Sequence, residues 1–337
     1  MNTAVQGISI CIPTYRMAGP LRELLDSMLP RLHADIEVCI SDNCSDDDTE
    51  QVVAEFLPKI PTLRYQRLPS NSGFDANVFS AIAMASKQWC WLLSSDDWMT
   101  PEGLEAVESH IMASAPDCSV ILGNRKNIYI DMPEMPQGVL PEDCFPAYAD
   151  GATIRARDLP TYFRASPTLN AAFGYLSSIV VRKQDWDGCA FGFAPFDGTR
   201  YAYTAKLMKT IIDGGALRIC KSHIVVQRFL RVPSERYLDR LMIDFDGYRR
   251  LGQELIPDAE SRRALWSILT RQGDHVLVLM KRLSSRQQWP RVEATLRAVG
   301  ISRMRIFRAS VWALLEPVVE RYYVCKHRLK QLLRYES

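Results

Sequence analysis

The sequence predicts an α/β fold with a mainly parallel sheet in about its first 125 residues, followed by a second, less regular half and a helical region. Short apolar runs alternate with helical patterns in the first part, which is typical of βαβ units. Polar clusters follow several of the apolar runs, where ligands of parallel sheets bind. From Ser234 onward, apolar residues recur at three- and four-residue spacing, which predicts helices.

The first part is expected to contain five strands and four helices. The predicted strands are Ile8–Ile12, Ile36–Ser41, Leu63–Leu68, Trp89–Leu93 and Ser119–Leu122. The predicted helices are Gly19–Pro30, Asp47–Leu57, Asp75–Ser86 and Pro101–Ala113.

The centre of the chain is less regular. Residues 124–173 are rich in proline and weakly periodic, as functional or mobile loops often are. Beyond them we expect a strand at Tyr175–Val181, a helix at Tyr201–Asp213 and a strand pair at Leu217–Cys220 and Ile224–Arg228. These patterns divide the chain into residues 1–125, 126–232 and 233–337.

Composition limits the classes of protein. With 337 residues and 47% hydrophobic content the chain can bury more than one core, and a net charge of +2 does not indicate a nucleic-acid binder. The nine scattered cysteines form no CxxC pair, which favours a reduced, cytoplasmic chain over a disulfide framework or a zinc site. We expect no signal peptide, and charges interrupt the apolar segment Ile306–Cys325, so it is not expected to span a bilayer.

Three polar clusters follow the first strands. Pro13-Thr14-Tyr15-Arg16 fits either a nucleotide-binding loop or an ordinary strand-to-helix turn, in which proline ends the ladder. Asp42 follows the second strand, where a carboxylate can bind ribose hydroxyls or a base, whereas Asp46 to Thr49 resemble a helix cap. In the third cluster Asp75 is the expected N-cap of its helix, and Asn77 faces either solvent or a ligand.

The most informative stretch is WCWLLSSDDW, residues 89–98, in which a buried strand delivers Asp96 and Asp97 to its carboxyl end. Adjacent carboxylates repel, so they need a cation or generous hydrogen bonding. A divalent metal bound to a diphosphate supplies that cation. The alternative is that one aspartate caps the next helix while the other is solvated.

Together, "ISICIPTYR", "VCISDNCSDDDTE", "SNSGFDAN" and "WCWLLSSDDWMTPEGL" resemble the successive donor-site motifs of inverting GT-A glycosyltransferases of family 2. The resemblance is to the abequosyltransferase-like branch, which decorates bacterial O-antigen and related polysaccharides. It covers the first third well, the centre loosely, and the C-terminal helices not at all. It implies a donor-binding half at 1–125 and an acceptor-binding half at 126–232.

The resemblance also implies residue roles. Pro13, Thr14 and Tyr15 would line the nucleotide pocket, Asp42 would hold the base or ribose, and Asn77 would face the donor. Asp96 would reach the donor sugar or ribose, and Asp97 would bind Mg²⁺ or Mn²⁺ beside the diphosphate. Ser95 replaces the usual first acid of the DxD motif, which makes strict metal dependence uncertain.

Inverting transfer also needs a base that takes the proton of the acceptor hydroxyl. In the family this acid follows DxD at a distance; here "FAPFDGTRYAY" occupies that place, and Asp197 is its only carboxylate. Asp185 and Asp187 compete for the role, but residues 184–188 are expected to form a polar turn.

Other side chains carry weaker expectations. Arg228 and Arg231, just past the last predicted strand, fit either diphosphate ligands or solvated surface arginines. The aromatic set Trp186, Phe191, Phe193 and Phe196 fits either an acceptor wall or, by default, core packing.

The C-terminal tail is basic and amphipathic. It could lie on an anionic membrane surface, as would suit a lipid-linked acceptor, or pack on the core or on a second subunit. Its basic residues are Arg303, Arg305, Arg308, Arg321, Lys326, Arg328, Lys330 and Arg334.

The sequence therefore predicts a cytoplasmic glycosyltransferase that uses a nucleotide diphosphate sugar and a glycan or lipid-linked acceptor. It would work at the inner face of the plasma membrane if the tail binds lipid. One alternative is an inactive nucleotide-sugar-binding partner protein. Another is a nucleotidyltransferase, which the absence of a Gly-rich, basic loop after the first strand disfavours.

Overall fold

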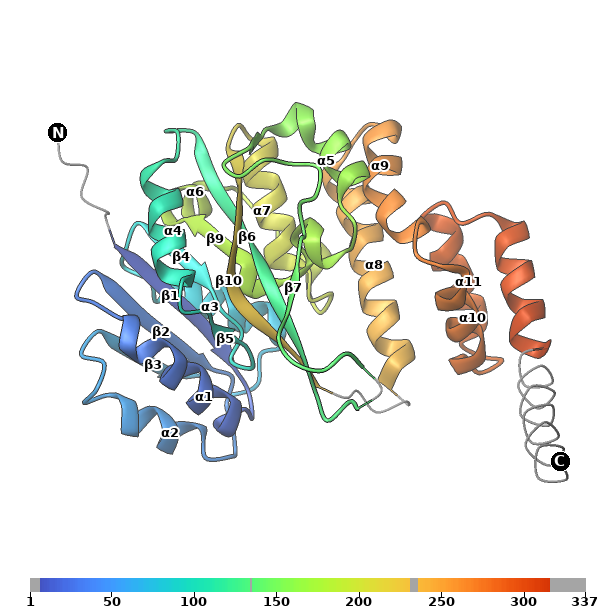
Figure 1. Cartoon of the computed structure of the whole chain (residues 1–337). Coiled ribbons are helices and arrows are strands. Elements are labelled where there is room, and N and C mark those ends of the chain that lie inside the picture. Colours follow the sequence, from blue (N-terminus) through green and yellow to red (C-terminus); the bar gives the residue numbers. More distant parts are fainter. Residues whose placement is uncertain (1–6, 134, 231–235, 316–337) are drawn as a thin grey trace, which may run out of the picture. The chain divides into compact units, whose positions relative to one another are not determined.

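A computed structural model of the chain describes residues 7–133, 135–230 and 236–315 (Figure 1). The chain divides into two compact units. The first comprises Met1–Arg231 with Arg250–Leu265, and the second comprises Val232–Arg249 with Trp266–Ser337.

The first unit contains a sheet with the strand order β3-β2-β1-β4-β9-β6-β10-β5, in which β7 also pairs with β6, and β8 with β10. Its strands are β1 Ile8–Thr14, β2 Ile36–Asp42, β3 Leu63–Arg67, β4 Trp89–Leu92, β5 Trp98–Met99, β6 Cys118–Ile130, β7 Leu140–Glu142, β8 Thr153–Ile154, β9 Ile179–Arg182 and β10 Ala216–Leu230.

Strands β1 to β4 are parallel to one another, and β10 is parallel to β6. Because β9 is antiparallel to both β4 and β6, the strands β4 and β6 run in the same direction. The carboxyl ends of β1, β2, β4, β6 and β10 therefore lie at one edge of the sheet, which we call the carboxyl edge.

Helices flank this sheet (Figure 1). They are α1 Ala18–Met28, α2 Thr49–Phe56, α3 Phe74–Ala83, α4 Gly103–Met112, α5 Leu159–Ala165, α6 Lys183–Gly188 and α7 Ala202–Ile212. Alternation along β1 places Ile8, Ile10 and Ile12 in one core cluster with residues of α1, α2 and α4. Helix α3 packs on β1 and β2 and also contacts α7.

The second unit is helical. Its elements are the first part of α8 Tyr237–Leu255, the end of α9 Ala259–Thr270, α10 Asp274–Leu283, α11 Trp289–Ala298 and a helical segment at 303–315. Asp246 joins α8 to α11, because it accepts a hydrogen bond from Thr295 Oγ1 (3.2 Å) and lies 3.5 Å from Arg291. Within the described residues, every helix is too short or too polar to cross a lipid bilayer.

The first four strands and helices lie within a few residues of their predicted bounds, but other predictions were wrong. The expected strand pair near the end of the first unit is one strand, β10, which register shifts interrupt between Cys220 and Val225. The polar turn expected at residues 184–188 is part of helix α6. The strand expected from Tyr175 begins at Ile179. Strand β1 runs through Pro13 to Thr14, so the proline does not end the ladder.

The described cysteines are all free thiols; Cys325 lies outside the described residues.

Candidate active site

Asp42 is the last residue of β2 and lies in register with Thr14, the last residue of β1. It is 0% exposed. Its Oδ1 accepts hydrogen bonds from the Ser45 amide (2.9 Å) and hydroxyl (2.5 Å), and its Oδ2 accepts one from Tyr65 (2.8 Å). These donors offset the cost of removing the carboxylate from water. Asp42 is therefore held rigidly at the carboxyl edge.

Thr14 is fixed from the other side by Asn77. The Asn77 amide donates to the Thr14 carbonyl (3.1 Å) and accepts from the Ser41 hydroxyl (2.7 Å). The buried Thr14 hydroxyl, by contrast, has no hydrogen-bond partner within the described part of the chain. An orphaned buried hydroxyl is unusual in a folded protein, and a polar ligand at this edge would satisfy it.

The loop after β1 is tied to the loop after β2. Arg16 adopts a positive φ of 53° and pairs with Asp46 (2.5 Å), and its guanidinium lies 5.0 Å from the ring of Tyr15. Asp47 accepts from the amides of Ala18 (3.0 Å) and Thr49 (3.2 Å). Asp46 and Asp47, which the sequence assigned to the cap of α2, thus position the loop that carries Tyr15.

Asp97 is almost as enclosed as Asp42, with 2% of its surface exposed. Its Oδ2 accepts from the hydroxyls of Tyr175 (2.7 Å) and Ser177 (2.5 Å), and its Oδ1 accepts from the Arg228 amide (3.1 Å). Burial, together with the charge of Asp96, raises the pKa of Asp97 to about 7. Oδ1 keeps an acceptor position, and a cation there would favour the ionised form.

Arg228 holds the turn that carries these acids. Its Nε donates to the Asp96 carbonyl, its Nη1 pairs with Glu23 of α1 (2.5 Å), and its guanidinium lies 4.9 Å from the ring centroid of Trp98. The Asp96 carboxylate, half-buried, accepts from Ser94. Arg228 was expected at the very end of the last strand but lies within β10, because this strand continues to Leu230. Arg231 lies outside the described residues.

The acids present fit a divalent cation that is shared with a diphosphate. Mg²⁺ is commonly bound by one or two carboxylates together with substrate phosphates, and Asp97 Oδ1 with the Asp96 carboxylate offers such a set. Ser95, which stands in place of the first acid, is buried.

Asp197 is exposed and follows the short helix at Ala194–Phe196. Its charge acts on the buried Asp75, whose pKa rises to about 6, mainly through burial. The prediction that Asp75 caps its own helix was wrong. Its carboxylate accepts from the amides of Arg200 (2.7 Å) and Ala202 (3.1 Å), where α7 begins.

The competing acids Asp185 and Asp187 lie at the opposite edge of the sheet. Strand β9 runs antiparallel to β4 and ends at Arg182, which is in register with Trp89 at the start of β4. Both acids follow in α6, where Asp187 pairs with Lys183. The topology therefore separates them from Asp96 and Asp97.

The aromatic residues named from the sequence pack around Phe79 and on one another; Trp186 and Phe196 are buried, and Phe191 and Phe193 are half-buried. Phe79 of α3 lies 5.1 Å from Trp186, 6.0 Å from Phe191 and 5.2 Å from Phe193, measured between ring centroids. Phe196 is buried and stacks on Phe191.

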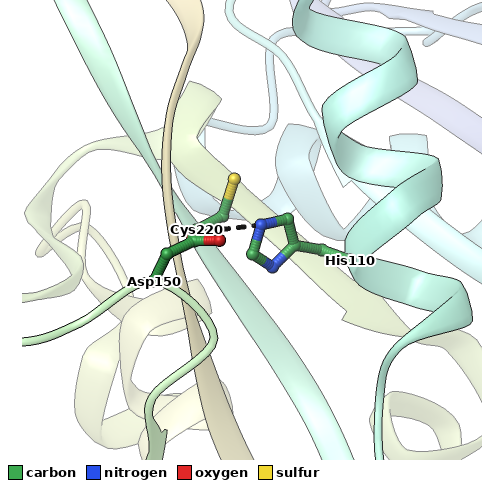
Figure 2. Close-up of side chains that lie close together, drawn as sticks. All are labelled: His110, Asp150 and Cys220. Atoms are coloured by element: carbon green, nitrogen blue, oxygen red, sulfur yellow. Dashed lines mark ion pairs between the residues drawn. The ribbon is translucent and has the colours of Figure 1, made fainter.

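A second group of potential metal ligands lies elsewhere in the first unit (Figure 2). The ligand atoms of His110, Asp150 and Cys220 all lie within 4.8 Å of one another. However, Arg218 Nε donates to His110 Nδ1 (3.2 Å), so the ring carries its proton on Nε2, which faces Asp150 (3.3 Å). Burial lowers the pKa of His110 and raises that of Cys220 to about 11. A neutral donor ring, a thiol and a nearby guanidinium disfavour a cation, so we interpret this group as a structural anchor.

Sequence reasoning missed Tyr175 and Ser177. The available signal was a pair of serines, Ser177 and Ser178, inside an otherwise apolar segment. It could not reveal that the first of them binds Asp97, 80 residues earlier in the chain.

Comparison with known proteins relates part of the chain to a known family. Residues 9–167 match the family model described as Glycosyl transferase family 2. The abequosyltransferase RfbV of Salmonella typhimurium is 28% identical over 275 residues, which cover 79% of this chain and 80% of that protein.

Two solved structures resemble the chain. TarS 1-349 of S. aureus in complex with UDP has a TM-score of 0.62 at 18% identity and covers 93% of this chain and 86% of its own. The mannosyltransferase PcManGT from Pyrobaculum calidifontis, in complex with GDP-Man and Mn²⁺, has a TM-score of 0.54 at 16% identity, with coverages of 93% and 88%. These similarities show that the fold is of the GT-A type.

Proposed function

We propose that the chain, a glycosyltransferase whose residues 9–167 match the model of glycosyltransferase family 2, transfers a sugar from a nucleotide diphosphate sugar to a glycan or lipid-linked hydroxyl. We further propose that transfer proceeds with inversion and serves the synthesis of a bacterial O-antigen-like polysaccharide. The main support is the half-buried Asp96 next to the buried Asp97, both held by Arg228 at the same edge as Asp42.

In this proposal the donor nucleotide lies across the ends of β1 and β2. The unpaired hydroxyl of Thr14 would form a hydrogen bond with the ligand, and Tyr15 would contact the base. Asp42 would fix the shape of the pocket, because its carboxylate holds the loop at Ser45. Pro13 and Asn77 would act indirectly, because both support the backbone at Thr14.

Asp97 would hold the divalent cation through Oδ1, and Asp96 would reach the donor sugar or ribose. When bound, the cation neutralises charge that develops on the leaving diphosphate. Arg228 keeps both acids in place and adds positive charge to this side of the site. Arg231 remains a proposed diphosphate ligand.

Asp197 would be the base that takes the proton of the acceptor hydroxyl. Its exposure fits this role, because the carboxylate must reach an incoming substrate. Asp75 would position it indirectly, by fixing the backbone at Arg200 and Ala202.

A thermal-shift panel of UDP, CDP, TDP and GDP, each with and without Mn²⁺, tests the donor site. A ligand that binds only the folded state raises its melting temperature. We expect one nucleotide to stabilise the protein, and Mn²⁺ to enlarge the shift in the wild type but not in Asp97→Asn. Asp35→Asn, at an exposed aspartate, is the matched control. Failure of all four nucleotides to shift the melting temperature would contradict the proposal.

Ser95 also supports a second candidate, an inactive partner that binds the nucleotide sugar without turnover. The two candidates differ in donor hydrolysis. A transferase releases the nucleoside diphosphate slowly in the absence of acceptor, and this release is lost in Asp97→Asn; an inactive partner releases none.

We also propose that the protein works at the inner face of the plasma membrane, in contact with lipid through residues 303–315. This segment leaves a row of large apolar side chains exposed, next to the exposed Arg303 and Arg308. The row consists of Met304, Phe307, Val311, Trp312, Leu314 and Leu315. The basic residues from Arg321 onward lie outside the described residues.

Co-sedimentation with anionic vesicles tests this contact. We expect the full chain to bind and Phe307→Glu to lose binding, while Met112→Glu, at an exposed methionine of α4, keeps it. Equal binding by all three proteins would contradict the membrane contact.

A further inference from the structure

We propose that the projecting ends of β6 and β10 form a subsite for a neutral sugar unit of the acceptor. Arg125, Asn127 and Gln227 would bind this sugar through hydrogen bonds. This inference rests on the proposed transferase function and adds the part of the site that receives the acceptor. It depends on residues that the donor motifs do not include.

The two strands are the longest of the sheet and pair in parallel along their last residues. Arg125 is in register with Val225, Asn127 with Gln227, and Tyr129 with Phe229. Registered residues of parallel strands project to the same face, so these side chains form one row. At its end the rings of Tyr129 and Phe229 stack, with their centroids 4.9 Å apart.

The row contains a concentration of unsatisfied buried polar atoms. Arg125 Nε and Nη1, Asn127 Oδ1 and Gln227 Oε1 all have no hydrogen-bond partner among the residues that the structure describes. Arg125 is 2% exposed. A buried polar atom that stays unpaired destabilises the fold, so four such atoms in one row indicate a ligand or trapped water.

The chemistry of the row favours a neutral hydroxyl-rich ligand. Glu142 of β7 pairs with Arg125 Nη2 (2.7 Å) and accepts from the Asn127 amide (2.6 Å), so the charge of the guanidinium is balanced. The remaining atoms are two donors and two acceptors beside an aromatic pair. A sugar hydroxyl both donates and accepts, and a pyranose face packs on aromatic rings, whereas a phosphate would meet the acceptor oxygens unfavourably.

The row also lies next to Asp97, on the side away from the proposed donor site. The guanidinium of Arg125 lies 5.0 Å from the ring centroid of Tyr175, whose hydroxyl binds Asp97. In the strand order, β1 and β2 lie on one side of β4, and β6 and β10 lie on the other. A donor at β1 and β2 and an acceptor at β6 and β10 would therefore meet at Asp97.

Saturation-transfer NMR tests the subsite. The full chain is mixed with the diamagnetic cation Mg²⁺, the nucleoside diphosphate that gives the largest thermal shift, and a panel of methyl glycosides of common hexoses and 6-deoxyhexoses. We expect at least one glycoside to receive saturation in the wild type. Gln227→Met and Asn127→Leu keep the shape but lose the amide, and each should weaken glycoside binding about tenfold. Gln66→Met, at an exposed glutamine of β3, should leave it unchanged.

The saturation-transfer signal of the nucleotide, measured in the same sample, distinguishes the proposed acceptor subsite from the proposed transferase function. If the nucleotide binds but no glycoside does, or if Gln227→Met and Asn127→Leu bind glycoside as the wild type does, the subsite is wrong and the donor site stands. If the nucleotide signal is absent as well, the proposed function itself fails. Higher thermal stability of Gln227→Met with unchanged glycoside binding would indicate that trapped water alone occupies the row.

Discussion

The acids at the ends of β2 and β4 are both buried at the carboxyl edge, but they are held in different ways. Asp42 takes its hydrogen bonds from Ser45 and Tyr65, which are 3 and 23 residues away. Asp97 takes its own from Tyr175, Ser177 and Arg228, which are 78, 80 and 131 residues away. The partners of Asp42 thus come from the first third of the chain, whereas those of Asp97 come from the second half. The surroundings of Asp97 therefore form only when the second half has folded.

We therefore expect the two acids to have different roles. The surroundings of Asp42 can form from residues 1–125 alone, which suits recognition of the nucleotide. The surroundings of Asp97 combine residues 1–125 with residues 126–232, which suits the step in which donor and acceptor meet. Substitutions on the Asp97 side should therefore affect turnover most, and those on the Thr14 and Asp42 side should affect nucleotide affinity most.

The largest effect is expected for Asp197→Asn. Loss of a general base lowers the rate by about 10² to 10⁴, and the donor affinity should stay the same because Asp197 does not contact the nucleotide in our proposal. Steady-state transfer rates and nucleotide titrations measure the two quantities. Asp185→Asn, at the opposite edge of the sheet, is the control, and the assignment fails if that variant loses activity while Asp197→Asn keeps it.

Asp97→Asn should lose transfer by roughly 10² to 10³ and yet stabilise the ligand-free protein at alkaline pH. Because the pKa of Asp97 is raised to about 7, the folded state binds its proton more tightly than the unfolded state does. That contribution to stability is complete below the unfolded pKa of about 4 and is lost as pH rises through about 7. Asparagine is neutral throughout; its oxygen can accept from the Arg228 amide, and its NH₂ group can donate to the hydroxyl oxygens of Tyr175 and Ser177.

Melting temperatures at pH 5.5 and 8.5 check this expectation. The gain of Asp97→Asn over the wild type should be larger at pH 8.5, and Asp35→Asn should show no such trend. A gain that is the same at both pH values would show that burial of the charge does not destabilise the ligand-free protein.

The local structure around Asp42 could be predicted from the sequence better than the surroundings of Asp97, for the same physical reason. Strand, turn and acid are adjacent in the chain at Thr14 and Asp42, so local patterns reveal them. The partners of Asp97 are distant in the chain, and β10 was mistaken for two strands because its register shifts interrupt the alternation of apolar residues. Asp75 was assigned to its own helix since local capping patterns cannot show that it binds the start of α7.

Arg228→Lys should have an intermediate effect. Lysine keeps the charge but lacks the planar guanidinium, which donates to the Asp96 carbonyl and to Glu23 at the same time. Loosening of the Asp96–Asp97 turn should lower kcat/KM about tenfold, as expected for hydrogen bonds to charged groups. Arg22→Lys is the control, because its pair with Glu55 is exposed and involves neither Asp96 nor Asp97. Equal loss in both variants would attribute the effect to general destabilisation.

The smallest effect is expected for Thr14→Val on the donor side. Valine keeps the shape of threonine and removes the orphaned hydroxyl, so the ligand-free protein should gain about 1 kcal/mol while nucleotide affinity falls roughly threefold to tenfold. Thr204→Val is the matched control, because its buried hydroxyl donates to the Phe173 carbonyl (3.2 Å). That variant should lose stability and keep nucleotide affinity. Calorimetric titration and thermal melts measure both quantities, and a Thr14→Val protein that binds nucleotide as tightly as the wild type would place the donor elsewhere along the carboxyl edge.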